Sequence, residues 1–368
     1  MYMDETIYHI ALSVMKGGAS REFSRIRGRM SAREFYDAVP LYVRDRVAGH
    51  VALEYKGSPL DVAQRIAERA ESRFIRIVTL CDPAYPAMLS EIPDPPLALY
   101  CIGRVPSGEM ISIVGTREAS EQGICAAARL SSDLSALGIT VVSGMARGID
   151  RAAHLGALEA GGATVGVLAH GIDRRYPASN EDVFVMVERS PVSSLVSEYP
   201  PGVQAGQWTF ALRNRIISGL ARAVIVVQAG VRSGAMITAR YAAEQGRDLY
   251  AVGGFPYDES FGGCRALIQD GGLIIGSAAE LCAGQLSLFP GAAGPSTESA
   301  PLPDPKEALP PLSPDEEKII ALIGECEKDI DEIIRESGLK PYAVAASLVS
   351  LEVAGLIARS GSTVSRKR

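Results

Sequence analysis

The chain has few of the residues that build metal centres and disulfide frameworks. Its 368 residues include six cysteines and only four histidines. The cysteines are scattered, with no Cys-x-x-Cys pair and no close Cys/His spacing. Zinc sites need such spacings, and disulfide-stabilised domains need a denser cysteine pattern. The sequence therefore predicts neither a metal site nor a disulfide framework.

Long hydrophobic runs are also missing. No uninterrupted apolar segment approaches the ~20 residues that a membrane span requires. The N-terminal stretch "MYMDETIYHIALSVMKGG" carries acidic residues where a secretory signal would be basic, and its apolar run is short. We expect a cytoplasmic protein that does not enter a membrane.

The chain has no excess of positive charge. Its formal net charge is −6, and its 47% hydrophobic and 22% charged residues are typical of a globular protein. Aromatic residues make up only 6% of the chain, so flat surfaces on which bases could stack are few. Any anion site must therefore come from the local placement of arginines and backbone N–H groups.

The sequence divides into four parts. Residues 1–72 alternate short helical patterns with charges and predict a small helical domain. Residues 73–288 open with the proline-rich stretch "TLCDPAYPAMLSEIPDPPLALYCIG", for which we expect an extended, turn-broken crossing. Residues 289–312 are rich in Pro, Ala and Ser and predict a linker. Residues 313–368 form the fourth part.

From Met110 onward, β-branched apolar runs alternate with amphipathic helical stretches. The runs "ISIVGT", "ITVVSG", "TVGVLAHG" and "AVIVVQAG" are apolar on both faces and end near a glycine. This pattern predicts an α/β fold with a doubly wound, mostly parallel sheet covered by helices on both faces. Ligands of such sheets bind beyond the carboxyl ends of the strands.

The last part has the outline of a winged helix. Ser313 and Glu316 form a capping-box pattern at a helix start. A helix, a glycine turn and a second helix are expected next, and "LIARSGSTVSRKR" predicts a hairpin wing.

Glycine turns at the expected strand ends carry the strongest functional signal, above all "SGMARGID" after the run "GITVV". Glycine lets backbone N–H groups approach an anion, a helix N-terminus adds partial positive charge, and arginine binds phosphate oxygens bidentately. One such turn is only a connector, but several at one sheet edge predict a site for several phosphates. The candidate residues are Gly115, Thr116, Arg117, Ser143, Gly144, Arg147, Gly148, Gly171, Arg174, Arg175, Arg213, Asn214, Arg215, Ser233 and Gly234.

Signatures of cofactor binding and catalysis are missing. There is no G-x-G-x-x-G, no acidic residue closing the second strand, and no P-loop. His154 is expected to pack within a helix, and no Ser or Cys nucleophile has a convincing partner near His170. Asp150 is expected to cap its helix, Glu198 to orient an arginine, and Phe210 to pack in the core. These patterns predict a binding protein with no cofactor, not an enzyme.

Several motifs occur in a familiar order: "IVGTREAS", "VVSGMARGIDRAAHLGAL", "GIDRRYPASN", "LVSEYPPG", "RNRIISGLARAVIVVQAG", "RSGAMITARYAAEQGRDLYAVGG" and "GGCRALIQDGG". From about residue 75 to 285 the chain resembles the DNA-processing protein DprA (Smf) family. The resemblance implies an extended Rossmann-like domain, a SAM-like helical domain before it and a winged-helix domain after it. It also implies a non-catalytic protein that binds single-stranded DNA, protects incoming DNA during natural transformation, and loads RecA recombinase.

The resemblance implies particular DNA-binding residues. These are Arg117, the loop Ser143–Asp150, and the two arginines Arg213 and Arg215. The sequence departs from the family at Ala178, where many members have lysine, so that a backbone contact is lost or taken over by Arg174 or Arg175. It also has Gly253 and Arg265 where the family commonly has other residues.

Two further expectations concern partners and an alternative function. The stretch "GGCRALIQDGGLIIG" leaves more apolar surface than one edge should expose, so we expect a homodimer whose interface includes Leu267 and Ile268. The alternative is a nucleotide-binding enzyme similar to phosphoribohydrolases, although "AGVRSGAMITA" lacks the catalytic glutamate such an enzyme needs. The second helix of the expected winged helix, "PYAVAASLVSLEVAG", is too apolar to read duplex DNA.

Overall fold

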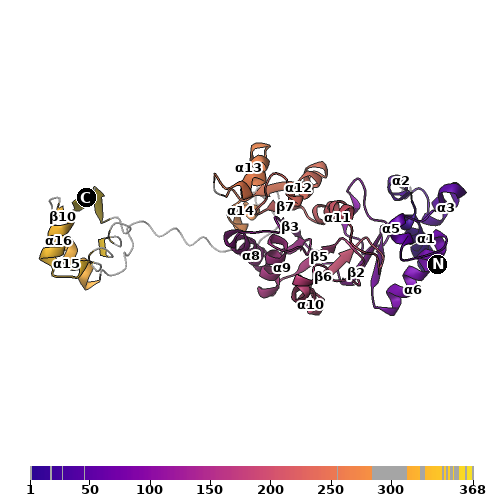
Figure 1. Ribbon diagram of the computed structural model, residues 1–368, viewed down its shortest axis with the longest axis horizontal. Coiled ribbons are helices and arrows are strands. Elements are labelled where there is room, and N and C mark those ends of the chain that lie inside the picture. The colour runs from indigo at the N-terminus through magenta and orange to yellow at the C-terminus, as the bar shows by residue number, and fades with distance from the viewer. Residues whose placement is uncertain are drawn as a thin grey trace. The chain divides into compact units, whose positions relative to one another are not determined.

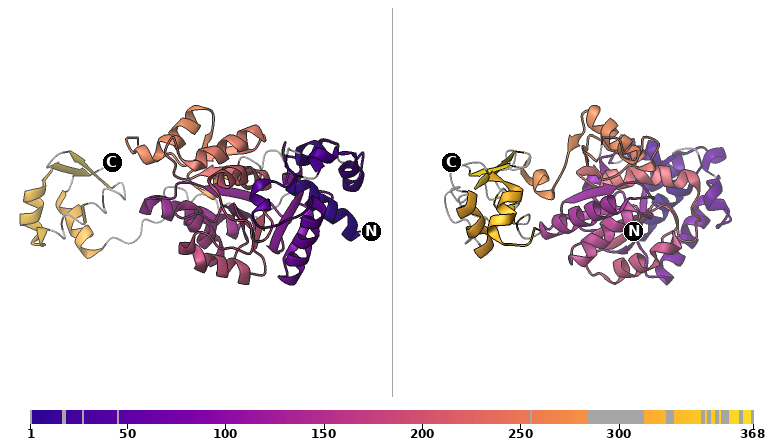
Figure 2. Two further views of the ribbon diagram at one scale, coloured as in Figure 1. Left: turned by 45° about the vertical axis from the view of Figure 1, so that its right-hand side comes forward. Right: turned by 60° about the vertical axis from the view of Figure 1, so that its left-hand side comes forward.

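The computed structural model describes residues 2–16, 19–26, 28–44, 46–254, 256–283, 313–323 and 328–341, and 344, 347–348, 351, 356–360 and 363–366. The chain forms two compact units, Met1–Leu288 and Phe289–Arg368. Figures 1 and 2 show both. The predicted linker 289–312 lies outside the described residues.

The first unit begins with a cluster of helices. They are α1 (Tyr2–Val14), α2 (Ala19–Ile26), α3 (Ala32–Ala38), α4 (Leu41–Arg44), α5 (Gly49–Ala52) and α6 (Pro59–Ser72). Capping boxes start two of them, because Ser31 pairs with Glu34 at α3 and Ser58 pairs with Asp61 at α6. The apolar faces of α1 and α6 are buried, and the predicted domain end at residue 72 coincides with the end of α6.

A nine-stranded sheet follows, in the order β1-β2-β6-β5-β4-β3-β7-β8-β9. Its strands are β1 (Arg76–Thr79), β2 (Ala98–Gly103), β3 (Met110–Val114), β4 (Thr140–Ser143), β5 (Thr164–Leu168), β6 (Ser194–Ser197), β7 (Ala223–Val226), β8 (Asp248–Ala251) and β9 (Leu273–Ile274). β1 and β2 are antiparallel to their neighbours, whereas the strands from β6 to β9 are parallel.

The proline-rich stretch is broken by turns, as predicted, and its last residues form the extended strand β2 of the sheet. β1 and β2 add to the sheet edge, and only the short α7 (Ala87–Ser90) and its turns lie between them. The prolines fall in that connection, while both strands are free of proline. Their backbone donors thus stay available for the ladder, which proline would interrupt.

Helices cover both faces of the sheet, as Figure 2 shows. α8 (Glu121–Ala136) and α9 (Ile149–Glu159) pack on the face that buries Ile111, Ile113 and Ile225. α11 (Gln207–Leu220) and α12 (Gly234–Glu244) contribute to the other core, with Val224 and Val226. The remaining elements are η1 (Ala178–Asn180), α10 (Glu181–Arg189), η2 (Glu259–Phe261), α13 (Gly262–Gln269) and α14 (Ala278–Ala283). The doubly wound, mostly parallel sheet is confirmed.

The helical cluster docks on the loops beyond β5 and β6. The Tyr55 hydroxyl donates to the Pro201 carbonyl at 2.6 Å. The buried Asp173 carboxylate accepts hydrogen bonds from Arg69 at 3.1 Å, from Arg73 at 2.6 Å, and from the Gly202 N–H at 2.6 Å. These contacts hold the helices and the sheet in one compact unit.

The second unit is small. Its elements are α15 (Pro314–Ile323), β10 (Lys328–Asp329), α16 (Ile330–Ser337), β11 (Ile357–Ser360) and β12 (Thr363–Arg366), with the strand order β10-β12-β11. Ser313 and Glu316 form the predicted cap, since the Ser313 N–H donates to the Glu316 carboxylate at 2.7 Å. The predicted hairpin wing is the antiparallel pair β11 and β12. Within the described residues, no helix of either unit is both long and apolar enough to cross a bilayer.

Candidate functional site

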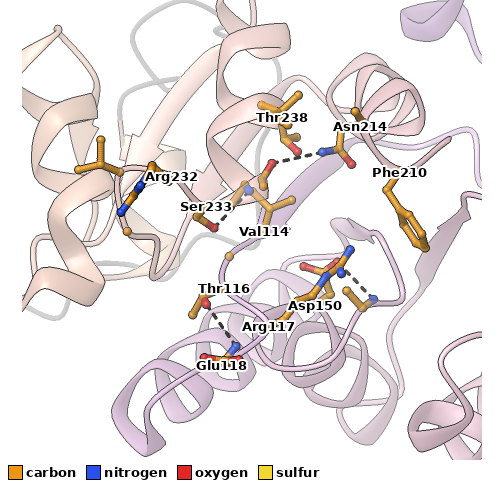
Figure 3. Close-up of a pocket in the computed structure, with 18 of the residues that line it drawn as sticks. Val114, Thr116, Arg117, Glu118, Asp150, Phe210, Asn214, Arg232, Ser233 and Thr238 are labelled. Atoms are coloured by element: carbon orange, nitrogen blue, oxygen red, sulfur yellow. Dashed lines mark hydrogen bonds between the residues drawn. The ribbon is translucent and has the colours of Figure 1, made fainter. Parts of the chain in front are cut away.

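The strand order reverses between β3 and β7, and a hollow of the sheet edge lies at their carboxyl ends. A cavity of about 1090 Å³ opens there, and a second cavity of about 350 Å³ adjoins it. Arg117, Ala146, Arg147, Phe210 and Arg213 line both cavities. Figure 3 shows the larger cavity. A switch point of this kind is where open α/β sheets bind their ligands.

The turn after β3 places Arg117 at the junction of the two cavities. The Thr116 N–H donates to the Gln228 carbonyl at 2.7 Å, which ties the end of β3 to the segment after β7. A Cβ on Gly115 would lie 2.4 Å from the Ile149 side chain, so only glycine fits this turn. Arg117 is exposed, and its guanidinium carbon lies 5.1 Å from the centroid of the Phe210 ring.

The second turn, residues 143–150, supplies Gly144 and Arg147 to the cavities. Ser143 and Gly148 line neither cavity and instead build the loop. The buried Ser143 hydroxyl donates to the Ile113 carbonyl at 2.6 Å. Gly148 has a φ of 73°, and a Cβ there would lie 2.4 Å from the Thr116 carbonyl oxygen. Gly148 thus lets the first two turns pack together.

Asp150 organises this loop and does not act as the cap of α9, contrary to expectation. Its carboxylate accepts the N–H groups of Gly144 at 3.2 Å and Ala146 at 3.4 Å. The N-cap position of α9 is Gly148. Burial raises the pKa of Asp150, while Arg213 and the two backbone donors oppose that shift.

His154 supports the same loop from beneath, as the sequence predicts for a packing residue. Its Nε2 accepts the Met145 N–H at 3.4 Å, and its Nδ1 lies 2.7 Å from the Thr164 hydroxyl, which donates to the Val141 carbonyl. This pattern places the proton on Nδ1. Burial, aided by Arg213, lowers the pKa of His154 to about 3, so the ring stays neutral.

The two arginines of "RNR" have different environments. Arg213 lines both cavities but is 4% exposed, and it donates to the Gly144 carbonyl at 2.7 Å and to the Val167 carbonyl. Burial lowers the pKa of Arg213 to about 10. Arg215 does not reach either cavity, because it pairs with both oxygens of Glu198 at 2.9 and 2.5 Å. Glu198 therefore orients an arginine, as predicted, and Arg215 is removed from the candidate site.

The third turn, residues 169–180, reaches the smaller cavity through His170 and Tyr176, but its three predicted site residues line neither cavity. Gly171 packs against the backbone of residues 200–203, and Arg174 donates to the Gly202 carbonyl at 2.7 Å. Arg175 pairs with Glu181 and Glu188. The prediction that Gly171, Arg174 and Arg175 join the other turns is not met, because neighbouring backbone and carboxylates hold them elsewhere.

The N-terminus of α12 forms the far wall of the larger cavity. Ser233 caps this helix by accepting the Ala235 N–H at 3.4 Å, and Gly234 and Asn214 line the cavity beside it. The Asn214 amide donates to the Gly234 carbonyl at 3.3 Å, joining α11 to α12. The first turn of α12 has no acidic side chain. Its partial positive charge is therefore available to an anion in the cavity.

Two arginines of the larger cavity were not predicted as site residues, although Arg265 was noted as a departure from the family. Arg232 precedes the α12 cap, and Arg265 comes from α13, where it donates to the Asp258 carbonyl at 2.8 Å. Arg117, Arg147 and Arg232 are exposed, and none of them has an ion-pair partner within the described parts of the chain. Glu118, Asp150 and Glu259 are the carboxylates in the same lining, and Asp150 is engaged by the loop.

Phe210 was expected in the core, and this was wrong. It is half-buried at the junction of the cavities, with Arg117 over its ring and the ring of the exposed Tyr176 centred 5.8 Å away. His170 lies in the smaller cavity, and its Nδ1 is 3.0 Å from the Gly171 carbonyl. Burial lowers the pKa of His170. The junction thus offers aromatic faces beside cations.

Comparison with known proteins identifies the family. The family model described as "DNA recombination-mediator protein A" matches residues 76–284, more than half of the chain. The chain belongs to the DprA family. A second model, "DprA winged helix domain", matches residues 303–361, which confirms the winged-helix prediction.

Relatives and solved structures agree with this assignment. "Protein Smf" of Synechocystis is 34% identical over 327 residues, covering 79% of this chain and 80% of the relative. The solved DprA of Streptococcus pneumoniae is 31% identical with a TM-score of 0.55, covering 72% of this chain and 85% of that one. DNA processing protein A of Helicobacter pylori, solved in work on its "unique single-stranded DNA binding mode", is 26% identical with a TM-score of 0.51, covering 58% and 96%.

Within the DprA family, the structure locates both departures of this sequence. Ala178 begins η1, and neither Arg174 nor Arg175 reaches the cavities in place of the missing lysine. Arg265, by contrast, lines the larger cavity. Ala178 itself lines neither cavity.

The buried neutral state of His154 predicts an acid-labile loop. Burial lowers the pKa of His154 to about 3 in the folded chain, below the ordinary histidine value of about 6.5, so the unfolded chain binds the proton first as the pH falls. The free energy of unfolding should then decrease from about pH 6.5 downward, by about 2 kcal/mol between pH 7 and 5. Urea unfolding at both pH values measures this, with His154→Gln as the control that lacks the titrating ring. An equal pH dependence in both proteins would contradict the assignment.

Proposed function

We propose that this DprA-family chain binds single-stranded DNA by its phosphate backbone along the carboxyl edge of the sheet. The observation that carries this proposal is the convergence of Arg117, Arg147 and Arg232 on one cavity at the N-terminus of α12, without carboxylate partners among the described residues. Guanidinium groups that lack an internal partner keep their full capacity for phosphate.

Two features favour a single strand over a duplex or a small nucleotide. The cations are spread around a cavity of about 1090 Å³ with an adjoining one of about 350 Å³, which suits a run of phosphates. Phe210 and Tyr176 add flat faces on which unpaired bases can stack. In a duplex these base faces are already covered. The related Helicobacter pylori protein was studied for binding single-stranded DNA.

The wider role that we propose follows the family. The chain protects incoming DNA and loads RecA recombinase onto it during natural transformation, in the cytoplasm. It acts by binding and without a cofactor. The competing nucleotide hydrolase would need a glutamate after the α12 turn, where the sequence reads "RSGAMITA". In addition, the Ser233 hydroxyl there is engaged by the Ala235 N–H.

We also propose a homodimer, but through a different surface from the one expected. Leu267 is 8% exposed and belongs to the core of its own chain, and Ile268 is partly buried against that core, so the predicted pair offers little surface to a partner. The edge strand β9 instead exposes Leu273 at 56% and Ile274 at 62%. An edge strand with apolar side chains readily pairs with another chain.

Arg117→Ala should weaken single-strand binding to a similar extent for every sequence. Because one phosphate contact is lost, the slope of log K against log salt should flatten by ~0.7. The melting temperature should barely move, because the side chain is exposed. Titrations of labelled single strand, duplex and mononucleotide measure these effects.

Arg240→Ala is the matched control, since Arg240 is an 81% exposed arginine paired with Glu244 on α12. It removes the same charge away from the cavity. A wild-type slope in Arg117→Ala would exclude Arg117 from the site, and tighter binding of the mononucleotide than of any strand would favour the nucleotide-binding enzyme.

The chain should shorten the lag of RecA filament formation on strands coated with single-strand-binding protein. RecA nucleates slowly on such strands, and a protein that holds the backbone and contacts RecA would seed the filament. Fluorescence of labelled RecA on immobilised strands measures the lag. Arg117→Ala should leave most of the lag in place. An unchanged lag with the wild-type chain would exclude the loading role and leave strand binding intact.

Ile274→Arg should convert the dimer to a monomer in light scattering at micromolar concentration. The new charge would be buried without a partner at the proposed interface. Val192→Arg, which places the same charge at a residue 48% exposed between α10 and β6, is the control and should leave the mass unchanged. A wild-type chain that scatters as a monomer would contradict the proposed dimer.

A further inference from the structure

The only tryptophan of the chain, Trp208, lies in the first turn of α11 and is 46% exposed. Its indole ring is in contact with two other aromatic rings. The ring centroid of His50, from α5 of the helical cluster, lies 4.7 Å away at an interplanar angle of 69°. The ring of Tyr199, which is buried, lies 6.1 Å away at 79°. Near-perpendicular contacts of this kind hold an aromatic ring in a fixed orientation.

Two parts of the fold build this cluster. Trp208 and Tyr199 belong to the sheet domain, and His50 is brought to them by the docking of the helices through Tyr55 and Asp173. We name Trp208, His50 and Tyr199 the tryptophan platform. Figure 1 labels α5, which carries His50, and α11, which carries Trp208.

The platform lines neither cavity itself, but it adjoins the wall of the larger one along α11. Gln207, the neighbour of Trp208, lines that cavity together with Phe210, Ala211 and Asn214. Residues at these spacings share one helix face, and position 208 lies at the flank of that face. The first turn of α11 has no acidic side chain, so the positive end of the helix dipole lies beside the indole.

From these observations we propose that the tryptophan platform is a second stacking site, on which a strand leaving the cavity places an unpaired base. The proposal rests on the proposed function and adds a contribution of the helical cluster to DNA binding. An aromatic face stabilises any base, and the neighbouring helix terminus favours the phosphate beside it. The occupant is therefore single-stranded nucleic acid of any sequence.

The lone tryptophan makes the test specific, because all tryptophan emission reports this position. Oligothymidylates of about 4, 8 and 16 nucleotides are titrated into the full chain, with binding followed by anisotropy of a label and by tryptophan emission. The shortest strand should bind in the cavity with unchanged emission, and the longest should quench it. A duplex of the same length should not quench, since its bases are paired.

Affinity of variants supplies the second measurement. Trp208→Leu and His50→Ala should each weaken binding of the longest strand about five- to tenfold, the lower range for one stacked base, and leave the shortest strand unaffected. Trp208→Phe keeps an aromatic face and should recover most of the affinity. Phe74→Ala is the control, because Phe74 is 95% exposed and lines neither cavity. Circular dichroism checks that each variant folds.

The outcomes distinguish a failure of the tryptophan platform from a failure of the proposed strand binding in the cavity. If the longest strand binds in anisotropy without changing the emission, or if Trp208→Leu binds it as the wild type does, the tryptophan platform is not a DNA site. The exposed ring would then fit a contact with another protein. If no strand of any length binds, the proposed function fails together with the inference.

Discussion

The site depends on one buried pair of opposite charges that hold a single loop between them. Asp150, 6% exposed, accepts the N–H groups of Gly144 and Ala146, and Arg213, 4% exposed, donates to the carbonyl of Gly144. Removing either ion from water is costly unless its partners are complete. Here the loop backbone supplies them, so the fold of the loop and the burial of the pair require each other.

The consequences of this pair extend outward from the loop. A loop held from both sides keeps Gly148 against the first turn, where Thr116 and Arg117 follow β3. Arg117 can then be exposed without an internal partner, because the buried pair Asp150 and Arg213 holds the loop in its place. The division between a buried arginine that builds the site and exposed arginines that face a ligand is the main organising feature of this sheet edge.

Much of this fold could be predicted from the sequence, because it depends on local patterns. Apolar runs ending in glycine marked the parallel strands, and "LIARSGSTVSRKR" marked the wing. The site was predicted less well. Arg213 and Arg215 are two positions apart on a helix and so point in nearly opposite directions, yet the motif alone does not show which one faces the ligand. Arg175 forms ion pairs with Glu181 and Glu188 and so lies outside the cavities. These pairs depend on how η1 and α10 fold back toward Arg175, which the motif does not show. Arg232 and Arg265 belong to motifs that the sequence offers, but nothing in the motifs shows that these two side chains enter the cavity.

The distribution of charge has a kinetic consequence. The chain as a whole carries a net charge of −6, while Arg117, Arg147 and Arg232, exposed and without ion-pair partners among the described residues, line one cavity. At physiological ionic strength the field of a charge is screened within about 8 Å. A polyanion is therefore not drawn in from a distance, and the attraction begins only when the strand is almost in contact with the arginines. For the strand binding that we propose, such a surface favours capture of strands that are already nearby over a search through the surrounding solution.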